Sequence, residues 1–197
     1  MNSYRTYAEV ATELGFELVE PLRPSTCVVF KAKDLRTGDY VNLKMPHLTY
    51  TPAISLWETQ HISKENYLLE QIGFCQGVAG KRAFSRIDER RIPVLIKDFI
   101  EGRALSKEGV FIQEDNAKVI SDAVEYIHSF GFADLDLLAK NVIIRCDGVP
   151  FLVDLGRGRK FANSADFRNF REFDLKNLEE LLAGRKWARR DIDLISG

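Results

Sequence analysis

The most informative stretch of the chain is Gly131-Phe-Ala-Asp-Leu-Asp-Leu-Leu-Ala-Lys-Asn-Val-Ile-Ile-Arg-Cys-Asp-Gly-Val-Pro-Phe-Leu-Val-Asp-Leu-Gly156. It contains Asp136, then Asn141 five residues later, then Asp154 thirteen residues after that. Apolar runs at 142–144 and 151–153 flank a Cys-Asp-Gly turn, which predicts a β-hairpin. The hairpin would bring the three side chains to one end of a sheet, where carboxylate and amide oxygens suit Mg²⁺. This stretch therefore predicts a magnesium site of the kind that phosphoryl transfer requires.

Composition limits the class of protein. A chain of 197 residues suits one domain or two small lobes. Because 28 Lys and Arg face 29 Asp and Glu, the charge balance argues against a general nucleic-acid binder. The three cysteines are far apart and fit reduced thiols better than disulfides or a zinc site. There is no apolar run of 18 residues and no apolar signal core, so we expect a cytoplasmic protein.

The first half of the chain predicts a small β-rich unit, residues 1–101. Residues 4–14 favour a short helical extension that ends at Gly15, so that 1–15 precedes the sheet. The alternating apolar segments predict strands at 16–20, 26–32 and 40–45 and two more within 82–99. A single helix is expected from about 63 to 72, and its predicted buried side consists of Tyr67, Leu68 and Ile72.

The second half, residues 102–197, predicts a mainly helical unit. Ile100–Arg103 is interpreted as a connector, because glycine and charge interrupt the apolar pattern. Residues 116–130 have a helical apolar face, the hairpin follows, and a last helix is expected at 174–183. The order of elements favours an α+β fold, with a small sheet lobe hinged near residue 101 to a helical lobe.

Two charged residues upstream complete a phosphate site. Lys44 ends the predicted strand 41–44, and Glu65 lies 21 residues later on the predicted helix. Such a glutamate can hold the lysine against phosphate oxygens, while Asp136 serves as the base beside an acceptor hydroxyl. Each residue alone is more typical of a solvated surface charge. The complete order of Lys, Glu, Asp, Asn and Asp favours a kinase site.

This order resembles the protein-kinase-like superfamily over roughly residues 16–183. Val41-Asn-Leu-Lys44 is similar to the strand-three Val-Ala-Ile-Lys motif, Asp136–Asn141 to the Asp-x-x-x-x-Asn catalytic loop, and Asp154-Leu-Gly156 to Asp-Phe-Gly. The resemblance implies a two-lobed protein-kinase-like fold, with a small antiparallel β N-lobe containing one helix and a truncated, mainly helical C-lobe. It also implies ATP and Mg²⁺ as cofactors.

The resemblance also assigns site residues. The stretch 94–102 is similar to the hinge strand, whose backbone at Asp98, Phe99 and Ile100 would hold adenine. The implied metal ligands are Asn141 and Asp154. The implied catalytic residues are Asp136, Lys44 and Glu65, of which Lys44 also contacts the nucleotide.

Several features depart from the superfamily pattern. Residues 22–29, where a glycine-rich phosphate loop is expected, contain no glycine, although Arg23, Ser25 and Thr26 offer side-chain donors.

The catalytic loop and the downstream length depart as well. Asp134 and Leu135 replace the usual His-Arg, and Leu138 replaces a lysine typical of Ser/Thr protein kinases. The 41 residues after Gly156 are too few for an activation segment and a peptide-binding platform. These departures argue against protein-peptide substrates.

The short form is similar to the atypical minimal kinases, and the strings 127–136 and 155–160 most resemble the lipopolysaccharide core heptose kinases. This resemblance implies transfer of the γ-phosphate of ATP to a sugar or glycolipid hydroxyl at the cytoplasmic side of an inner membrane. Two alternatives stay open, namely an atypical RIO-like Ser/Thr protein kinase and a pseudokinase that acts as a scaffold for a protein partner.

Other charged residues have two interpretations each. Asp134 competes with Asp136 as the base or braces the loop, and Lys140 reaches the transferred phosphate or is solvated. Arg157, Arg159 and Lys160 bind an anionic acceptor or form an exposed charged loop.

Two further basic features are left open in the same way. Lys97 stands at the position beside adenine where small or apolar residues are usual, and either points outward or alters nucleotide binding. Arg185–Arg190 either contacts anionic headgroups, as a peripheral membrane contact, or belongs to a solvated terminal helix.

Overall fold

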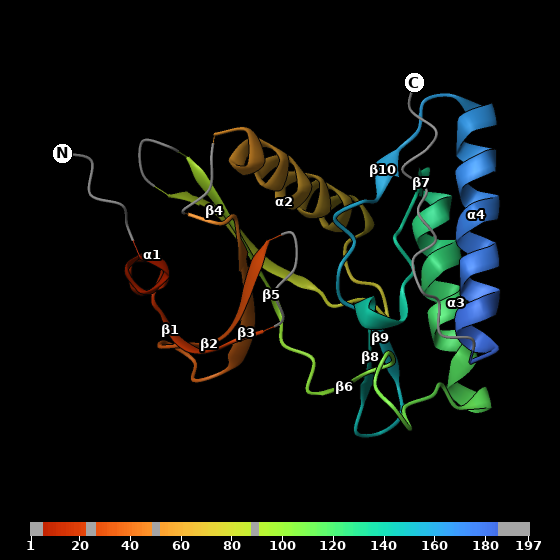
Figure 1. Cartoon of the computed structure of the whole chain (residues 1–197), viewed down its shortest axis with the longest axis horizontal. Coiled ribbons are helices and arrows are strands. Elements are labelled where there is room, and N and C mark those ends of the chain that lie inside the picture. The colour runs from red at the N-terminus through yellow and green to blue at the C-terminus, as the bar shows by residue number, and fades with distance from the viewer. Residues whose placement is uncertain (1–5, 23–26, 49–51, 88–90, 185–197) are drawn as a thin grey trace.

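The computed structural model describes residues 6–22, 27–48, 52–87 and 91–184. The described part is an α+β structure with four α-helices and a five-stranded antiparallel sheet, as the sequence predicted. Figure 1 shows the sheet with α1 on one side of the molecule and the helices α3 and α4 on the other, with α2 above the sheet.

The sheet contains the predicted strands in the order β1-β2-β3-β5-β4. Its strands are β1 Phe16–Pro21, β2 Val28–Asp34, β3 Tyr40–Met45, β4 Lys81–Ile87 and β5 Ile92–Asp98. The register opposes Lys44 to Leu95 and Asn42 to Lys97 across β3 and β5. The helix α1, Tyr7–Glu13, packs beside β1 and is capped by Thr6, which accepts the backbone N–H of Glu9.

The helix α2, Pro52–Ile72, begins about eleven residues before the predicted start. The early turns were missed because a buried side chain there is polar. Glu58 is 1% exposed and accepts a hydrogen bond from the backbone N–H of His47 at 2.7 Å. Tyr67 was wrongly predicted to be buried, since it is 45% exposed, although its ring forms an edge-type pair with the ring of Phe132.

The second half begins with a strand where a connector was expected. Gly102–Ala104 forms β6, which pairs with β8, Val142–Arg145, so the sequence interpretation of this segment was incomplete. A Cβ atom on Gly102 would lie 2.2 Å from the carbonyl oxygen of Ile144, and only glycine therefore permits this pairing. The predicted hairpin is confirmed, because β8 pairs antiparallel with β9, Pro150–Leu152.

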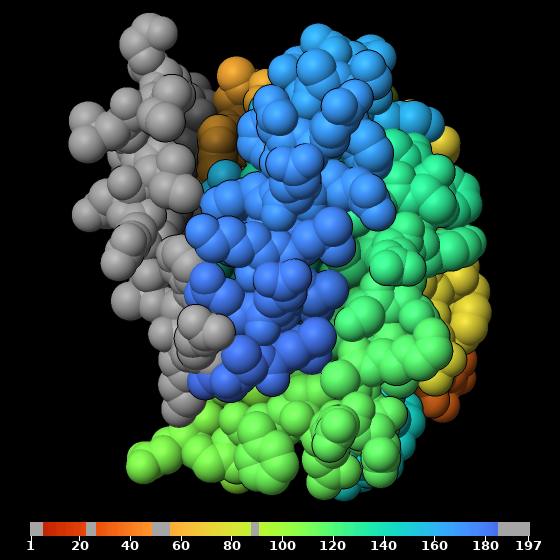
Figure 2. Space-filling view, turned by 90° about the vertical axis from the view of Figure 1, so that its right-hand side faces the viewer, coloured from red at the N-terminus to blue at the C-terminus, as the bar shows by residue number. Residues whose placement is uncertain are grey.

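Two long helices cover this half, with small elements between them and the hairpin. The helix α3, Glu114–Ser129, matches its prediction, whereas α4, Ser164–Leu182, begins ten residues before the predicted start and is capped by Asn163. The missed turns carry phenylalanines in a charged context rather than a leucine pattern. The remaining elements are β7 Phe132–Ala133, the 3₁₀ turn η1 Ala139–Asn141 and β10 Arg159–Lys160, which pairs with β7. Figure 2 shows the side of the molecule that lies on the right in Figure 1, with α4 running over its middle and α3 beside α4.

Two apolar clusters form the core. One lies between α1 and the sheet and includes Val10, Phe16 and Leu43. The larger one joins α2 to α3, α4 and the hairpin, for example through Leu68 and Ile127. Because α2 contributes to this larger cluster and also contacts β3 and β5, it fixes the sheet relative to the hairpin. Among the described helices, none is both long and apolar enough to cross a lipid bilayer.

Candidate active site

Lys44 lies at the centre of a buried cluster of charged side chains. Its ammonium donates to Glu65 Oε2 and to Asp154 Oδ1, both at 2.7 Å, although the three residues are distant in sequence. The side chains of Lys44 and Glu65 are 2% and 1% exposed. Burial alone would lower the pKa of Lys44, but the carboxylates of Asp154 and Glu65 outweigh it, and the pKa is raised above its ordinary value. The lysine is therefore a permanent cation.

Lys97 is the second lysine of this cluster. Its ammonium contacts Glu65 Oε1 and the backbone carbonyl of Val153, and its side chain is 4% exposed. The alternative that Lys97 points outward is therefore wrong. Burial alone would raise the pKa of Glu65, but the positive charges of Lys44 and Lys97 have the larger effect and hold the pKa below its ordinary value. Glu65 thus serves as a shared counter-ion that ties α2 to β3 and β5.

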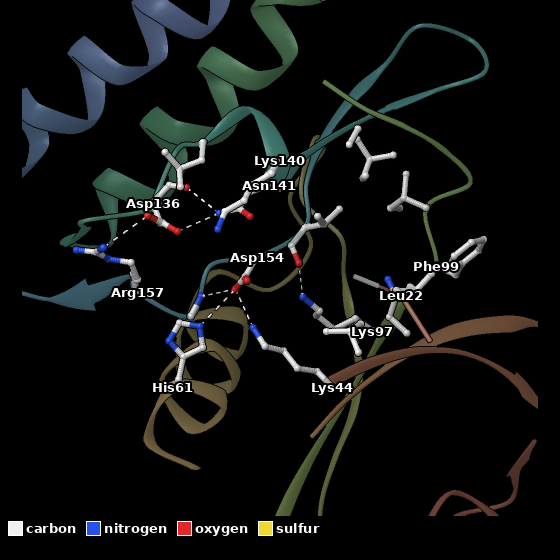
Figure 3. Close-up of a pocket in the computed structure, with 18 of the residues that line it drawn as sticks. Leu22, Lys44, His61, Lys97, Phe99, Asp136, Lys140, Asn141, Asp154 and Arg157 are labelled. Carbon is white, nitrogen blue, oxygen red and sulfur yellow. Dashed lines mark hydrogen bonds and ion pairs between the residues drawn. The ribbon is translucent and has the colours of Figure 1, made fainter. Parts of the chain in front are cut away.

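Asp154 follows β9 and keeps an oxygen available toward the cavity. Its Oδ1 accepts from Lys44, accepts the backbone N–H of Gly156 at 3.2 Å, and lies 3.6 Å from Nε2 of His61. None of these contacts uses Oδ2, and the side chain is 30% exposed. Despite burial, Lys44 and His61 hold the pKa of Asp154 well below its ordinary value. The group is an ionised carboxylate, with one oxygen fixed by the protein (Figure 3).

Asn141 and Asp136 form a second unit, directly above Asp154 in Figure 3. The amide nitrogen of Asn141 donates to the backbone oxygen of Asp136 at 3.0 Å and to its Oδ2 at 3.1 Å. The amide oxygen of Asn141 is consequently left to face other ligands. The backbone of Asn141 accepts the N–H of Val153 at 3.0 Å, which aligns it with the residue before Asp154.

The backbone of the loop is held in an uncommon conformation. Asp134 and Asp136 have φ values of 64° and 53°, in the left-handed region that costs energy for non-glycine residues. The fully buried carboxylate of Asp174 on α4 accepts the backbone N–H groups of Asp134 and Leu135 at 2.9 and 3.0 Å, and lies 3.1 Å from Nε2 of His128. Asp174 thus pins the loop so that Asp136 faces the cavity.

Two arginines approach the aspartates of the loop. Arg157 lies 3.5 Å from Asp134 Oδ1 and 3.6 Å from Asp136 Oδ1, and Arg159 lies 3.2 Å from Asp134 Oδ2. Burial raises the pKa of Asp134 even though Arg157 and Arg159 lower it. The alternative that Asp134 braces the loop is favoured, since it is buried and is the main partner of both arginines.

A cavity of about 1090 Å³ connects these groups. Its lining includes six of the predicted site residues, which are Lys44, Phe99, Ile100, Asp136, Asn141 and Asp154. The volume lies at the upper end of the ~300–1,000 Å³ of ordinary ligand pockets, so the cavity is large enough for a small-molecule ligand. Lys140 also lines the cavity, while Arg23, Ser25 and Thr26 lie outside the described residues.

Two predicted residues lie outside the lining. Glu65 is behind Lys44 and contacts it directly. Asp98 has its backbone N–H bonded to Gly80 and its carbonyl bonded to the amide of Asn42, and its side chain pairs with Arg82 at 2.6 Å. Of the three residues 98–100, Phe99 and Ile100 line the cavity.

The donor set fits one kind of cation site. In the described part of the chain, no group of three or more His, Cys, Asp or Glu side chains is arranged to hold a metal ion by itself. The oxygens left by the hydrogen bonds above are one from Asn141 and one from Asp154. Two such hard oxygens suit Mg²⁺ only when phosphate oxygens and water supply the other ligands.

Sequence reasoning missed His61 and Asp174 and left the role of Lys97 open. His61 lay before the predicted start of α2, although it is four residues before Glu65 and hence on the same helix face. Asp174 was placed at the start of the last helix, but its burial marks an interior position. For Lys97, a lysine within the apolar strand β5 was the available signal.

Comparison with known proteins gives a distant match. The chain is 27% identical over 115 residues to a mouse protein described as "Sperm motility kinase Tcr mutant form" (Mus musculus), covering 55% of this chain and 24% of that protein. The chain thus matches about a quarter of the length of that relative. No protein-family model matches the chain. The match indicates a distant relationship to a protein named as a kinase.

Proposed function

We propose that the chain is an ATP-dependent phosphotransferase, which moves the γ-phosphate to a hydroxyl group of a sugar or glycolipid, similar to a lipopolysaccharide core acceptor. The observation that carries this proposal is Lys44 bonded at once to Glu65 and Asp154, with Asn141 bonded to Asp136 across the same cavity. Such a set positions phosphates and a hydroxyl, which is most of what phosphoryl transfer requires.

The proposed fold is the two-lobed kinase-like arrangement, with an N-lobe of residues 1–101 and a C-lobe of residues 102–197. The cavity supports this division, because its lining comes from both halves of the chain. In this arrangement adenine lies at Phe99 and Ile100, and the phosphates extend toward Lys44.

The side chains then have distinct roles. Asn141 and Asp154 would hold Mg²⁺, which neutralises charge on the phosphate oxygens. Glu65 orients Lys44 onto those oxygens. Asp136 orients the acceptor hydroxyl and takes its proton as the hydroxyl oxygen bonds to the γ-phosphorus and the bond to the β-phosphate oxygen breaks, with release of ADP.

The test has a binding step and a transfer step. ATP with Mg²⁺ should raise Tm more than ATP with EDTA, and Asp154→Asn should remove the difference while Asp147→Asn, an exposed hairpin control, keeps it. Asp136→Asn should retain the Mg²⁺-dependent shift yet lower the rate of transfer about 10²–10⁴-fold. A chain whose Tm is unaffected by Mg²⁺ with ATP is not a kinase of this type.

A competition assay identifies the class of acceptor. Lipopolysaccharide core, small sugars and a basic protein are offered together with labelled ATP, and the proposal requires that label enters the carbohydrate. Label in the protein instead would favour the atypical RIO-like Ser/Thr protein kinase.

A second candidate is a pseudokinase scaffold for a protein partner. It is favoured by the contact of Arg157 with Asp136 and by the absence of glycine in residues 22–29. Mg²⁺-dependent transfer to any acceptor, lost in Asp136→Asn, would exclude it.

A further inference from the structure

The cavity has a surplus of positive charge. Its described lining residues include eight lysines and arginines but only four aspartates and glutamates, although the whole chain has a net charge of −1. Lys44 and Lys97 are balanced by Glu65 and Asp154, with which they form the buried cluster. The surplus therefore belongs to the rest of the cavity, whose lining has six lysines and arginines and three aspartates and glutamates. Arg157 and Arg159 form one end of this region, where Arg157 lies near Asp134 and Asp136 and Arg159 lies near Asp134.

Arg157 and Arg159 keep most of their donors available. Their contacts to Asp134 and Asp136 are single approaches of 3.2–3.6 Å rather than paired short bonds, and the side chains are 47% and 48% exposed. A guanidinium carries five N–H donors, and its strongest contacts are bidentate and shorter, near ~2.8 Å. The aspartates hold the arginines in place without saturating them.

Arg159 is also oriented by aromatic rings. Its guanidinium carbon lies 4.5 Å from the ring centre of Phe170 and 5.2 Å from that of Phe161, and these rings stack on each other at 4.9 Å. Stacking of this kind fixes the plane of a guanidinium and reduces the entropy that it loses on binding an anion. Arg159 is thus prearranged by the two rings, and Arg157 is held beside it by its contacts with Asp134 and Asp136.

The wall of the cavity that leads to Arg157 carries an exposed aromatic ring. Trp57 on α2 lines the cavity, is 51% exposed and stacks on His61 at 5.3 Å with an interplanar angle of 19°. His61 in turn packs on Gly156, where an added Cβ would lie 2.2 Å from Nε2. Trp57, His61 and Gly156 therefore form a continuous wall that ends next to Arg157. A flat ring at this place can support the apolar face of a sugar.

We propose that Arg157 and Arg159 form an anion subsite for the acceptor, so that the preferred acceptor is a sugar bearing a phosphate group, bound between Trp57 and Asp136. This inference rests on the proposed function, whose acceptor it specifies. The phosphate would draw Arg157 from its 3.6 Å contact with Asp136, because a bidentate phosphate is the stronger partner. An anionic acceptor thereby frees the carboxylate that receives its hydroxyl.

The test compares binding of glucose 6-phosphate, glucuronate and glucose to the full chain without nucleotide, by calorimetry. Glucose 6-phosphate should bind at least tenfold more tightly than glucose, and the double variant R157Q/R159Q should abolish that preference. Arg145→Gln is the matched control, because Arg145 is a half-exposed arginine paired with Asp147 outside the cavity. The variant R157K/R159K keeps the charge but loses the fork, and should show an intermediate preference if it folds with an unchanged Tm.

In turnover, R157Q/R159Q should raise KM for the phosphorylated sugar about tenfold or more, with little change in KM for the neutral sugar. The inference is overturned if glucose binds as well as glucose 6-phosphate, or if the double variant binds glucose 6-phosphate like the wild type. Glucuronate binding better than glucose 6-phosphate would overturn the choice of phosphate. Failure of Mg²⁺ with ATP to raise Tm would instead refute the proposed function, and the two failures are therefore distinguishable.

Discussion

Replacing Lys97 with methionine should destabilise the protein far more than the loss of an ordinary surface lysine. The change keeps the apolar length of the side chain and removes the ammonium that contacts Glu65, whose side chain is 1% exposed. Glu65 and Asp154 would then share Lys44 alone, which leaves a buried negative charge in excess.

The magnitude follows from the burial of both partners. Breaking a buried ion pair by removing one member costs about 3–5 kcal/mol. Because Glu65 retains Lys44 at 2.7 Å and the backbone N–H of Leu155 at 3.3 Å, we expect the lower end, about 3 kcal/mol. Urea denaturation measures this as a lower midpoint at an unchanged m-value.

Lys81→Met is the matched control, since Lys81 pairs with Glu70 at the surface, where the side chains are 20% and 48% exposed. That pair should contribute at most about 1 kcal/mol. The double variant K97M/E65Q should lose less than the sum of its single variants, with a coupling of about 1–3 kcal/mol. If Lys97→Met is no more destabilising than Lys81→Met, the argument that Lys97 stabilises Glu65 is refuted.

Three other predictions test the same architecture. Burial raises the pKa of Cys27 to about 12. At pH ~8 iodoacetamide should therefore alkylate exposed Cys146 in the native chain and react with Cys27 only after unfolding. Equal alkylation rates of the two cysteines, measured by mass spectrometry, would contradict the burial of Cys27. Asp174→Asn should lower the free energy of unfolding by about 2–4 kcal/mol, because only one of the two terminal atoms of an amide can accept the hydrogen bonds that the carboxylate accepts from the backbone of Asp134 and Leu135. The control Asp166→Asn, at an exposed position, should change it by under about 0.5 kcal/mol. Burial raises the pKa of Asp134, so ionisation of this carboxyl destabilises the folded state. Asp134→Asn should therefore leave Tm nearly unchanged below pH 3.8 and raise Tm increasingly as the pH rises toward neutrality. A gain in Tm that shrinks with rising pH would contradict the direction of this pKa shift.

Local patterns in the sequence predicted much of the fold. The alternation in 40–45 and the apolar runs around the Cys-Asp-Gly turn are short-range signals, and they gave the right strands and hairpin. Boundaries were harder, because α2 and α4 contain turns whose buried face is polar or aromatic rather than aliphatic. Glu58 illustrates this, since its burial depends on His47, which lies outside the helix.

Short spacing in the sequence also predicted part of the site. Asp136, Asn141 and Asp154 lie close in sequence, so their spacing alone indicated that they meet. Lys97 and Asp174 act through contacts with residues 39–56 positions away, and no local pattern contains those contacts.

The sequence by itself determined the α+β class, the hairpin and the identity of the oxygen-bearing side chains, because each depends on residue types at short spacing. Only the tertiary structure decided that Glu65 is shared by two lysines and that Asp174 holds the strained loop. It also decided that Arg157 lies near Asp134 and Asp136 and that Arg159 lies near Asp134, rather than both being surrounded by solvent alone. Those features depend on packing α2 and α4 against the hairpin, because burial strengthens the ion pairs and the charged neighbours then decide the direction of the pKa shifts of Lys44, Glu65 and Asp154.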